Sequence, residues 1–241
     1  LKAGKFRVPR GLIQGQKLTQ MLRRETISIA GIDDFDRLPT RFRAVATDLE
    51  TGDRRVLAGG DLTEALRASM SAPGVFAPVE LNGRLLVDGG LVENLPVDVA
   101  REMGVDIVIA VDVGFQPVGR RELNSALAVS NQMLTIMMQR ETDRQRKLLV
   151  DGDVLIEPQL GTMPSLDFTV VGQTVMRGAD GARGQAARLA ELSVGELEWR
   201  RYVAARAAGE SELPEIQFVR VDAKSRRYRE RIEAELSPVV G

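Results

Sequence analysis

The segment 97–113 constrains the fold more than any other part of the sequence. Residues 97–103 have helical spacing and end at Gly104, and residues 105–113 that follow are almost continuously apolar. A helix that leads directly into an uninterrupted apolar strand is typical of a parallel sheet that is covered on both faces. We therefore expect an α/β fold with a mainly parallel central sheet.

Local signals place further elements around this unit. Asp61 and Glu64 form a capping box, which predicts that a helix begins there. Asn82-Gly83 is a strong hairpin signal between two short apolar runs. The other predicted helices are 16–24, 121–148 and 181–194, the helix at the capping box extends to about residue 70, and the predicted strands are 42–47, 76–81, 84–87 and 154–158.

Composition limits the classes of function. The chain has 241 residues, 44% hydrophobic and 28% charged, which is enough to bury a sizeable core and to form one large domain, or one domain plus a fragment. The net charge is -1, so no overall field favours nucleic acid. Residues 1–24 carry only basic charges, and this stretch is either a solvated face or a lipid-binding patch. No apolar run approaches the about 20 residues of a membrane-spanning helix.

The chain contains neither cysteine nor histidine. Disulfides, thiolate zinc sites and cysteine nucleophiles are therefore excluded within it. A Ser-His-Asp triad or an imidazole-bound metal would need residues from outside this chain. Carboxylates, hydroxyls, lysines and arginines are the chemistry that remains.

One carboxylate stands in a turn that is typical of an active site. Asp88 follows the apolar run 85–87 and precedes Gly89 and Gly90, which allow the backbone to bend and another group to approach closely. Two alternatives stay open at this point. Asp88 could cap the helix that starts near Pro96, or Asp-Gly could be an ordinary turn.

A longer pattern contains this turn. It consists of A-S-x-S-A-P-G-x-F-x-P-V at 68–79, D-G-G at 88–90 and N-x-P at 94–96, and it resembles the patatin-like phospholipases over about residues 40–115. The resemblance implies a three-layer α/β/α fold and a serine acyl hydrolase with a Ser-Asp dyad. It assigns Asp88 to the dyad, places Gly89 and Gly90 in the active-site loop, and implies no cofactor.

The family's other two motifs are missing from this chain. We find neither G-x-S-x-G nor the glycine-rich turn G-G-G-x-[RK]-G that supplies the oxyanion hole, and both normally lie upstream of residue 1. The sequence starts at Leu1, so we expect that an N-terminal part is missing and that this chain alone is inactive. Ser69 and Ser71 lack the glycines of a nucleophile elbow. We expect them to form hydrogen bonds that fix the chain beneath the Asp88 loop.

Other carboxylates offer weaker alternatives. Asp88 with Glu93 could hold a divalent cation, but no D-x-D-x-D-G loop accompanies them, and we predict no metal site. Asp106 and Asp112 flank the apolar strand. The glycine pairs 59–60 and 89–90 do not fit a phosphate-binding loop.

The composition shifts near residue 209. We predict a patatin-like acyl hydrolase domain at 1–208, and a linker with a strand-helix pair at 209–241. The strand 216–221 and the helix 225–236 resemble the start of a POTRA module. With a patatin-like domain, this resembles the passenger of a bacterial autotransporter with downstream POTRA and barrel in the same polypeptide. It implies an outer-membrane, cell-surface or secreted location, and a cytoplasmic protein is the alternative.

Two functional hypotheses result. The first is a serine acyl hydrolase of the phospholipase A class, with phospholipid as substrate, the membrane surface as partner and no nucleic acid. The second is a non-catalytic α/β fragment that binds lipid or a protein partner, in which Asp88 is structural. Assembly into a homo-oligomer is left open.

Overall fold

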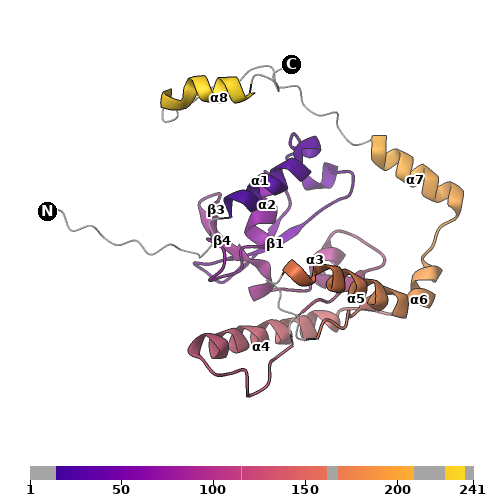
Figure 1. The fold of residues 1–241 in the computed structure, drawn as a ribbon. Coiled ribbons are helices and arrows are strands. Elements are labelled where there is room, and N and C mark those ends of the chain that lie inside the picture. The colour runs from indigo at the N-terminus through magenta and orange to yellow at the C-terminus, as the bar shows by residue number, and fades with distance from the viewer. Residues whose placement is uncertain (1–14, 115, 162–167, 209–225, 237–241) are drawn as a thin grey trace.

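The computed structural model describes residues 15–114, 116–161, 168–208 and 226–236 (Figure 1). Its strands are β1 (Ala44–Asp48), β2 (Arg54–Leu57), β3 (Val79–Leu81), β4 (Arg84–Asp88), β5 (Ile109–Val111) and β6 (Val154–Ile156). Its α-helices are α1 (Gln16–Glu25), α2 (Leu62–Ser69), α3 (Val97–Glu102), α4 (Ala126–Arg146), α5 (Val171–Gly184), α6 (Ala186–Glu191), α7 (Glu196–Ala208) and α8 (Arg229–Leu236). Short 3-10 turns include η3 (Gly89–Leu91), directly after β4.

The strands form two separate sheets, which corrects the predicted mainly parallel sheet. Four strands pair in the order β2-β1-β4-β3, and every pair in this sheet is antiparallel. Parallel pairing among the described residues is confined to β5 and β6. The reason is that β1–β2 and β3–β4 are hairpins, whose consecutive strands must run in opposite directions. The α/β character of the fold is retained.

The local turn and cap signals are confirmed. Asn82 has φ 52° and Gly83 has φ 72°, the positive values that a two-residue hairpin of type I′ requires. The Asp61 carboxylate accepts a hydrogen bond from the Glu64 amide at 3.2 Å and so caps α2. Both features depend only on residues that are adjacent in sequence.

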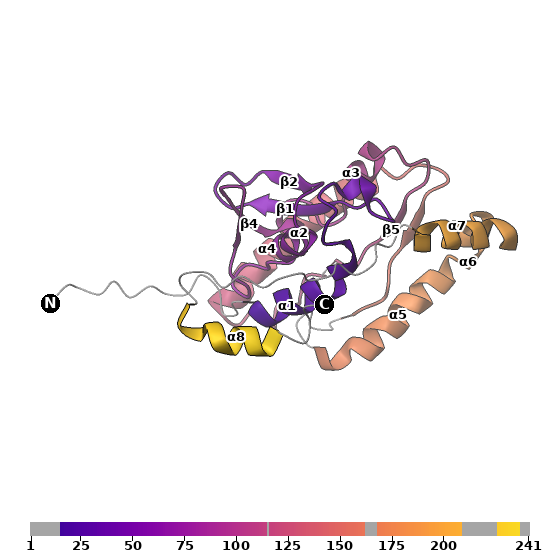
Figure 2. The ribbon, with the colours of Figure 1, turned by 90° about the horizontal axis from the view of Figure 1, so that it is seen from above.

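Helix α2 packs directly on the antiparallel sheet (Figure 2). Ala65 and Ala68 on its inner side are fully buried, and Ala44 and Ala46 of β1 lie in the same clusters of buried residues. Small side chains on both surfaces bring the helix axis close to the sheet. This packing fixes the segment that follows α2, which contacts the end of β4.

Strand β5 is buried on one face only, so the prediction that both faces are covered is wrong for this strand. Val108, Ala110 and Asp112 are buried. The alternate residues are 39–54% exposed and are all apolar: Val105, Ile107, Ile109, Val111 and Val113. Successive strand residues point to opposite faces, and one apolar face of this segment therefore lies open.

Several helix boundaries differ from the sequence prediction. Helix α4 begins at Ala126 because the Ser125 hydroxyl accepts from the Ala128 amide at 3.1 Å and caps it there. The helix predicted at 181–194 starts earlier and is split into α5 and α6 at Gln185. Helices α5, α6 and α7 follow one another along one side of the molecule (Figure 1).

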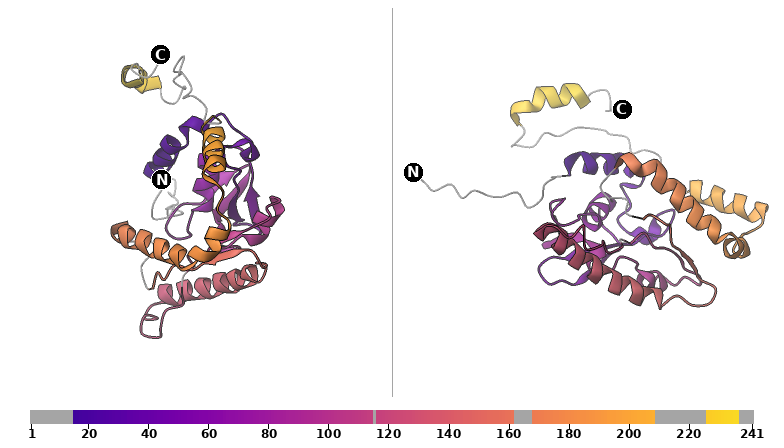
Figure 3. Two further views of the ribbon diagram at one scale, coloured as in Figure 1. Left: turned by 90° about the vertical axis from the view of Figure 1, so that its right-hand side faces the viewer. Right: turned by 60° about the horizontal axis from the view of Figure 1, so that its bottom comes forward.

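Only the helical part of the predicted tail can be compared with the structure. Helix α8 occupies residues 229–236 and lies apart from the other helices (Figure 3). The predicted strand 216–221 lies outside the described residues, and the POTRA resemblance gains no support. Among the described helices, none is long and apolar enough to cross a membrane.

Candidate functional site

Asp88 ends β4, and its backbone is held from two sides. Its amide donates to the Ser71 carbonyl oxygen at 3.0 Å, and its own carbonyl accepts from the Thr47 hydroxyl at 2.8 Å. Its side-chain Oδ1 accepts from the Gly90 amide at 2.8 Å and caps η3. Asp88 therefore caps η3, and the alternative that it caps the helix starting near Pro96 is wrong, because Pro96 itself is the N-cap residue of α3. The second carboxylate oxygen makes no hydrogen bond to any residue that the structure describes.

The Asp88 carboxylate is half-buried and has no cationic partner among the described residues. Burial raises its pKa above the usual range for aspartate, and the hydrogen bond from the Gly90 amide only partly opposes that rise. A carboxylate with a raised pKa is a stronger base than an exposed one. Asp88 therefore has the electrostatics that a general base needs.

The side chain of Asp88 lies in the wall of a hollow of about 590 Å³. Serine and glycine neighbours, Ser69, Gly89 and Gly90, share this wall. Much of the remaining wall is apolar and comes from α1, α2 and the segments beside them: Leu22, Phe42, Ala44, Val45, Leu66, Met70 and Pro96. A hollow of this kind can accept a hydrocarbon chain next to a carboxylate.

Gly89 and Gly90 are needed for space, since neither has a positive φ. A Cβ on Gly89 would stand 2.2 Å from the carbonyl oxygen of Val45 in β1. A Cβ on Gly90 would stand 2.8 Å from Asn94 Oδ1 and 3.1 Å from Asp88 Oδ1. The sequence predicted a close approach at these glycines. Among the described residues, the β1 backbone approaches Gly89, and the side chains of Asn94, Met138 and Asp88 approach Gly90.

Ser71 has the structural role expected of it. It is fully buried, and its hydroxyl donates to the Arg67 carbonyl oxygen at 2.6 Å and accepts from Arg67 Nη1 at 2.8 Å. Its backbone carbonyl receives the Asp88 amide, so Ser71 fixes the chain beneath the Asp88 loop. Ser69 differs, because it lines the hollow and its hydroxyl makes no hydrogen bond to any described residue.

Two of the other carboxylates singled out in the sequence, Glu93 and Asp112, are held by arginines. Glu93 is buried and bonds Arg54 Nη1 at 2.5 Å, and the same guanidinium bonds Asp98 at 2.8 Å. Arg54 thus takes Oε2 of Glu93, while Oε1 is buried without a hydrogen-bond partner among the described residues. Asp112 is buried and receives Nε and Nη2 of Arg146 at 2.8 and 2.5 Å. Asp106 is exposed.

Replacing Glu93 by glutamine should flatten the pH dependence of stability. Burial and the hydrogen bond with Asp98 raise the pKa of Glu93 to about 7, against the opposing effect of Arg54. The folded state then binds a proton more tightly than the unfolded state, so this carboxyl costs stability as the pH rises from about 4.5 to about 7. We expect Glu93→Gln to remove a loss of about 1–3 kcal/mol over this window, measured by urea unfolding at several pH values.

The exposed Glu80 on β3 provides the control for this measurement, because Glu80→Gln removes a carboxylate without changing a buried site. The free energy of unfolding of Glu80→Gln should follow that of the natural protein at every pH. A Glu93→Gln variant with an unchanged slope would contradict the assignment.

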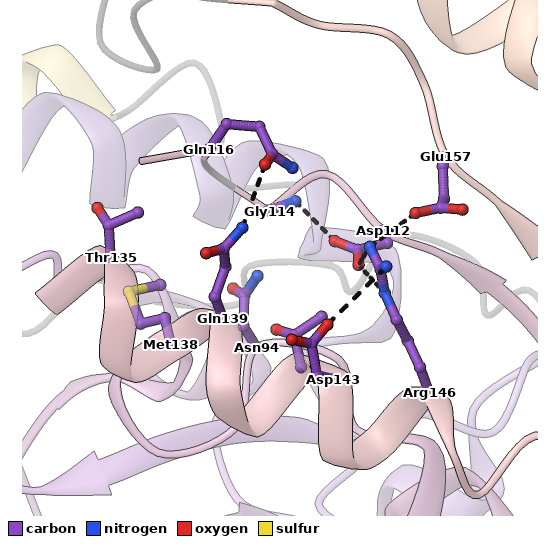
Figure 4. A pocket seen from close by; sticks show the side chains of 11 residues that line it. Asn94, Asp112, Gly114, Gln116, Thr135, Met138, Gln139, Asp143, Arg146 and Glu157 are labelled. Atoms are coloured by element: carbon purple, nitrogen blue, oxygen red, sulfur yellow. Dashed lines mark hydrogen bonds and ion pairs between the residues drawn. The ribbon is translucent and has the colours of Figure 1, made fainter. Parts of the chain in front are cut away.

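Helix α4 supplies functional groups that the sequence analysis missed. It packs against η3 and, together with Asn94 and the segment after β5, lines a polar cavity beside the Asp88 loop (Figure 4). Thr135, Gln139, Thr142 and Arg146 recur at intervals of three or four residues, so they share one face of the helix. This polar stripe at helical spacing was the signal available in the sequence.

The part of the chain that contains the Asp88 loop is similar to a known protein family. Residues 2–101 match the family model "Patatin-like phospholipase", and this stretch includes Asp88, Gly89 and Gly90. An uncharacterised NTE family protein of Mycobacterium tuberculosis is 37% identical over 109 residues, which are 45% of this chain and 29% of that protein.

Two mammalian proteins match a shorter stretch. "Patatin-like phospholipase domain-containing protein 7" of Mus musculus is 48% identical over 73 residues, which are 30% of this chain and 5% of that protein. "Patatin-like phospholipase domain-containing protein 6" of Homo sapiens is 46% identical over 74 residues, 30% of this chain and 5% of that protein. The chain thus spans less than a third of the length of each of these relatives.

Proposed function

We propose that the patatin-like phospholipase domain to which residues 2–101 correspond is a serine acyl hydrolase of the phospholipase A class. In this proposal Asp88 is the base of a Ser-Asp dyad, and the serine lies on a segment of the complete protein upstream of residue 1. The observation that carries it is the half-buried Asp88 carboxylate, which has no cationic partner among the residues that the structure describes and lies at the wall of a largely apolar hollow.

In each half of the reaction, Asp88 would accept one proton and then give it back. Asp88 accepts the proton of the serine hydroxyl while the serine oxygen attacks the ester carbonyl carbon. The tetrahedral intermediate collapses, the bond to the alcohol breaks, and the alcohol leaves with the proton from Asp88. Water then attacks the carbonyl carbon of the acyl-serine and gives one proton to Asp88. The bond between this carbon and the serine oxygen breaks, the serine oxygen takes the proton back from Asp88, and the fatty acid is released. No histidine is needed in this cycle.

The open face of β5 is an argument that another segment of the complete protein packs on it. Five apolar side chains on one face of residues 105–113 are 39–54% exposed. Contiguous exposed apolar surface of this kind usually marks a contact with another element. We propose that the segment carrying the serine covers this face.

The substrate and its surroundings complete the proposal. The hollow beside Asp88 would hold an acyl chain, and the ester would come from phospholipid at a membrane surface. Lys17, Arg23 and Arg24 of α1 are exposed and would favour an anionic surface. The cellular location stays a prediction from the sequence.

Fluorophosphonate labelling with mass-spectrometric mapping tests this function. The reagent reacts with activated serines, and it should label the complete protein at one serine upstream of residue 1. The 241-residue chain, treated in parallel, should stay unlabelled. Labelling of this chain at Ser69 or Ser71 would overturn the split dyad. An unlabelled complete protein that still floats with liposomes would favour the non-catalytic lipid-binding alternative.

A further inference from the structure

Helices α1 and α2 lie side by side and are joined at both ends (Figure 1). At one end, the hydroxyl of Thr26 after α1 hydrogen-bonds the hydroxyl of Thr63 at the start of α2 at 3.0 Å. At the other end, Gly15 packs against the guanidinium group of Arg67, since a Cβ on Gly15 would stand 2.7 Å from Arg67 Nε and 2.8 Å from its Cζ. The two helices therefore run in opposite directions, and the N-terminus of α1 lies beside Arg67.

The positive charge of Arg67 is not matched by a carboxylate. Arg67 is 5% exposed and forms no ion pair with any residue that the structure describes, including Glu64 one turn earlier in α2. Its Nη1 donates to the Ser71 hydroxyl at 2.8 Å, whereas Nε and Nη2 make no hydrogen bond to a described residue. The Phe76 ring, 4.6 Å from the guanidinium carbon, and the carbonyl end of α2 offset the charge only in part. Burial lowers the pKa of Arg67, as it does for a cation without a compensating anion.

The start of α1 adds positive potential at the same place. A helix N-terminus carries free amide groups and a partial positive charge. Gly15, the N-cap residue, has no side chain, no other described side chain caps this end, and the first turn of α1 contains Lys17 but no acidic residue. Two positive groups, the guanidinium of Arg67 and the helix end, thus lie next to each other. This arrangement is unfavourable unless an anion binds beside them.

The sequence that leads into α1 offers no such anion. The first carboxylate of the chain is Glu25, which lies at the far end of α1 and bonds Arg24 at 2.9 Å. Residues 1–24 carry basic charges only: Lys2, Lys5, Arg7, Arg10, Lys17, Arg23 and Arg24. This stretch therefore cannot neutralise Arg67, whereas a bound anion can.

The geometry of the donors favours a phosphate group. Nε and Nη2 form one edge of the guanidinium of Arg67, and this edge can donate to two oxygens of the same anion. The amides at the start of α1 can donate to a third oxygen, which a tetrahedral phosphate supplies and a carboxylate lacks. Gln16 and Lys17 are exposed, so this end of α1 is open to a ligand from solution.

We propose that Arg67 and the first turn of α1 form a binding site for a phosphate group. The free edge of the guanidinium and the α1 amides bind the phosphate oxygens, and Lys17 adds positive charge. Ser71 connects this site to the Asp88 loop, because its hydroxyl bonds Arg67 and its carbonyl oxygen accepts from the Asp88 amide. A phospholipid headgroup and free phosphate in solution both supply this chemistry.

Isothermal titration calorimetry of the complete protein with inorganic phosphate, at low ionic strength, tests the site. We expect saturable binding, and Arg67→Gln should weaken it at least about tenfold, because the charge and the bidentate contact are lost. Arg201→Gln in α7 is the matched control, since it removes one positive charge at an exposed position of another helix. It should bind like the natural protein. Equal weakening in the two variants would show a general effect of charge and would overturn the site.

A soluble phosphodiester distinguishes the two sources. Glycerophosphoglycerol has the headgroup chemistry of phosphatidylglycerol without its acyl chains. If the natural protein binds it at least as tightly as inorganic phosphate, and Arg67→Gln weakens this binding, the site takes a lipid headgroup. Tighter binding of inorganic phosphate with the same dependence on Arg67 would assign free phosphate. If neither compound binds the natural protein saturably, the site is overturned.

NMR on the natural protein decides the matter if Arg67→Gln does not fold. The Nε–H resonance of Arg67 and the Leu18 amide should shift as the bound compound is added, and the α7 amides should not. Shifts that leave Arg67 and α1 unaffected would overturn the site. None of these measurements involves ester cleavage, so their failure leaves the proposed hydrolase intact, and failed fluorophosphonate labelling leaves this site intact.

Discussion

Asparagine in place of Asp88 should lower kcat/KM for ester hydrolysis by the complete protein at least about a thousandfold. The amide has the shape of the carboxylate, and its oxygen can still accept the hydrogen bond that the Gly90 amide donates to Asp88. It cannot accept a proton from a serine hydroxyl. The loss should therefore lie in kcat, measured with a soluble ester under saturating conditions.

The same substitution should not destabilise the fold. Burial raises the pKa of Asp88 in the folded protein. The free energy of unfolding therefore falls as the pH rises above the usual pKa of aspartate, and Asp88→Asn removes this loss. Equal or higher stability together with lost turnover is the expected combination. Asp106→Asn, at an exposed position, should change neither quantity. Retained turnover in Asp88→Asn would contradict the catalytic assignment.

The pH profile of the natural protein gives an independent check on Asp88. Its carboxyl group must be ionised to act as a base, so kcat/KM should fall as the pH is lowered through its raised pKa. The acid limb should therefore lie at a higher pH than an exposed aspartate would give. An acid limb at the usual pKa of aspartate would indicate that another group is the base.

Sequence analysis predicted best the features that neighbouring residues determine. The hairpin at Asn82-Gly83 and the cap at Asp61 depend on backbone preferences within four residues, and both are present. The direction of strand pairing depends on partners far apart, such as Ala46 and Asp88, and apolar runs do not encode it. The helix and apolar run at 97–113 suggested a mainly parallel sheet, but they carry no information on how β1 to β4 pair.

The same distinction applies to the candidate site: residues close together in sequence were predicted, and residues far apart were missed. Asp88, Gly89 and Gly90 were found because they are contiguous in a recognisable motif. The polar cavity was missed because α4, which supplies Thr142 to the cavity wall, is about fifty residues downstream and comes beside the Asp88 loop only through its packing on η3.

Alanine in place of Gly89 should cause the largest loss of stability among the substitutions considered. Its Cβ would stand 2.2 Å from the Val45 carbonyl oxygen and 2.6 Å from the carbonyl carbon. Both atoms belong to the backbone of β1, the central strand that pairs with β2 and β4, so no side-chain rotation relieves the contact. Either β1 or the Asp88 loop must move. We expect a loss of about 3 kcal/mol or more, measured by urea unfolding.

Two other glycines show whether the cause is the backbone contact. A Cβ on Gly178 in α5 would meet no atom within 4 Å, and Gly178→Ala should stabilise the protein by about 0.5–1 kcal/mol. A Cβ on Gly90 meets side-chain atoms, which can shift, so Gly90→Ala should lose less stability than Gly89→Ala. Since one of those atoms is Asp88 Oδ1, its loss should be mainly in turnover. Equal stability losses at the two positions would contradict this explanation. They would show that a contact with the β1 backbone costs no more stability than a contact with side chains that can move.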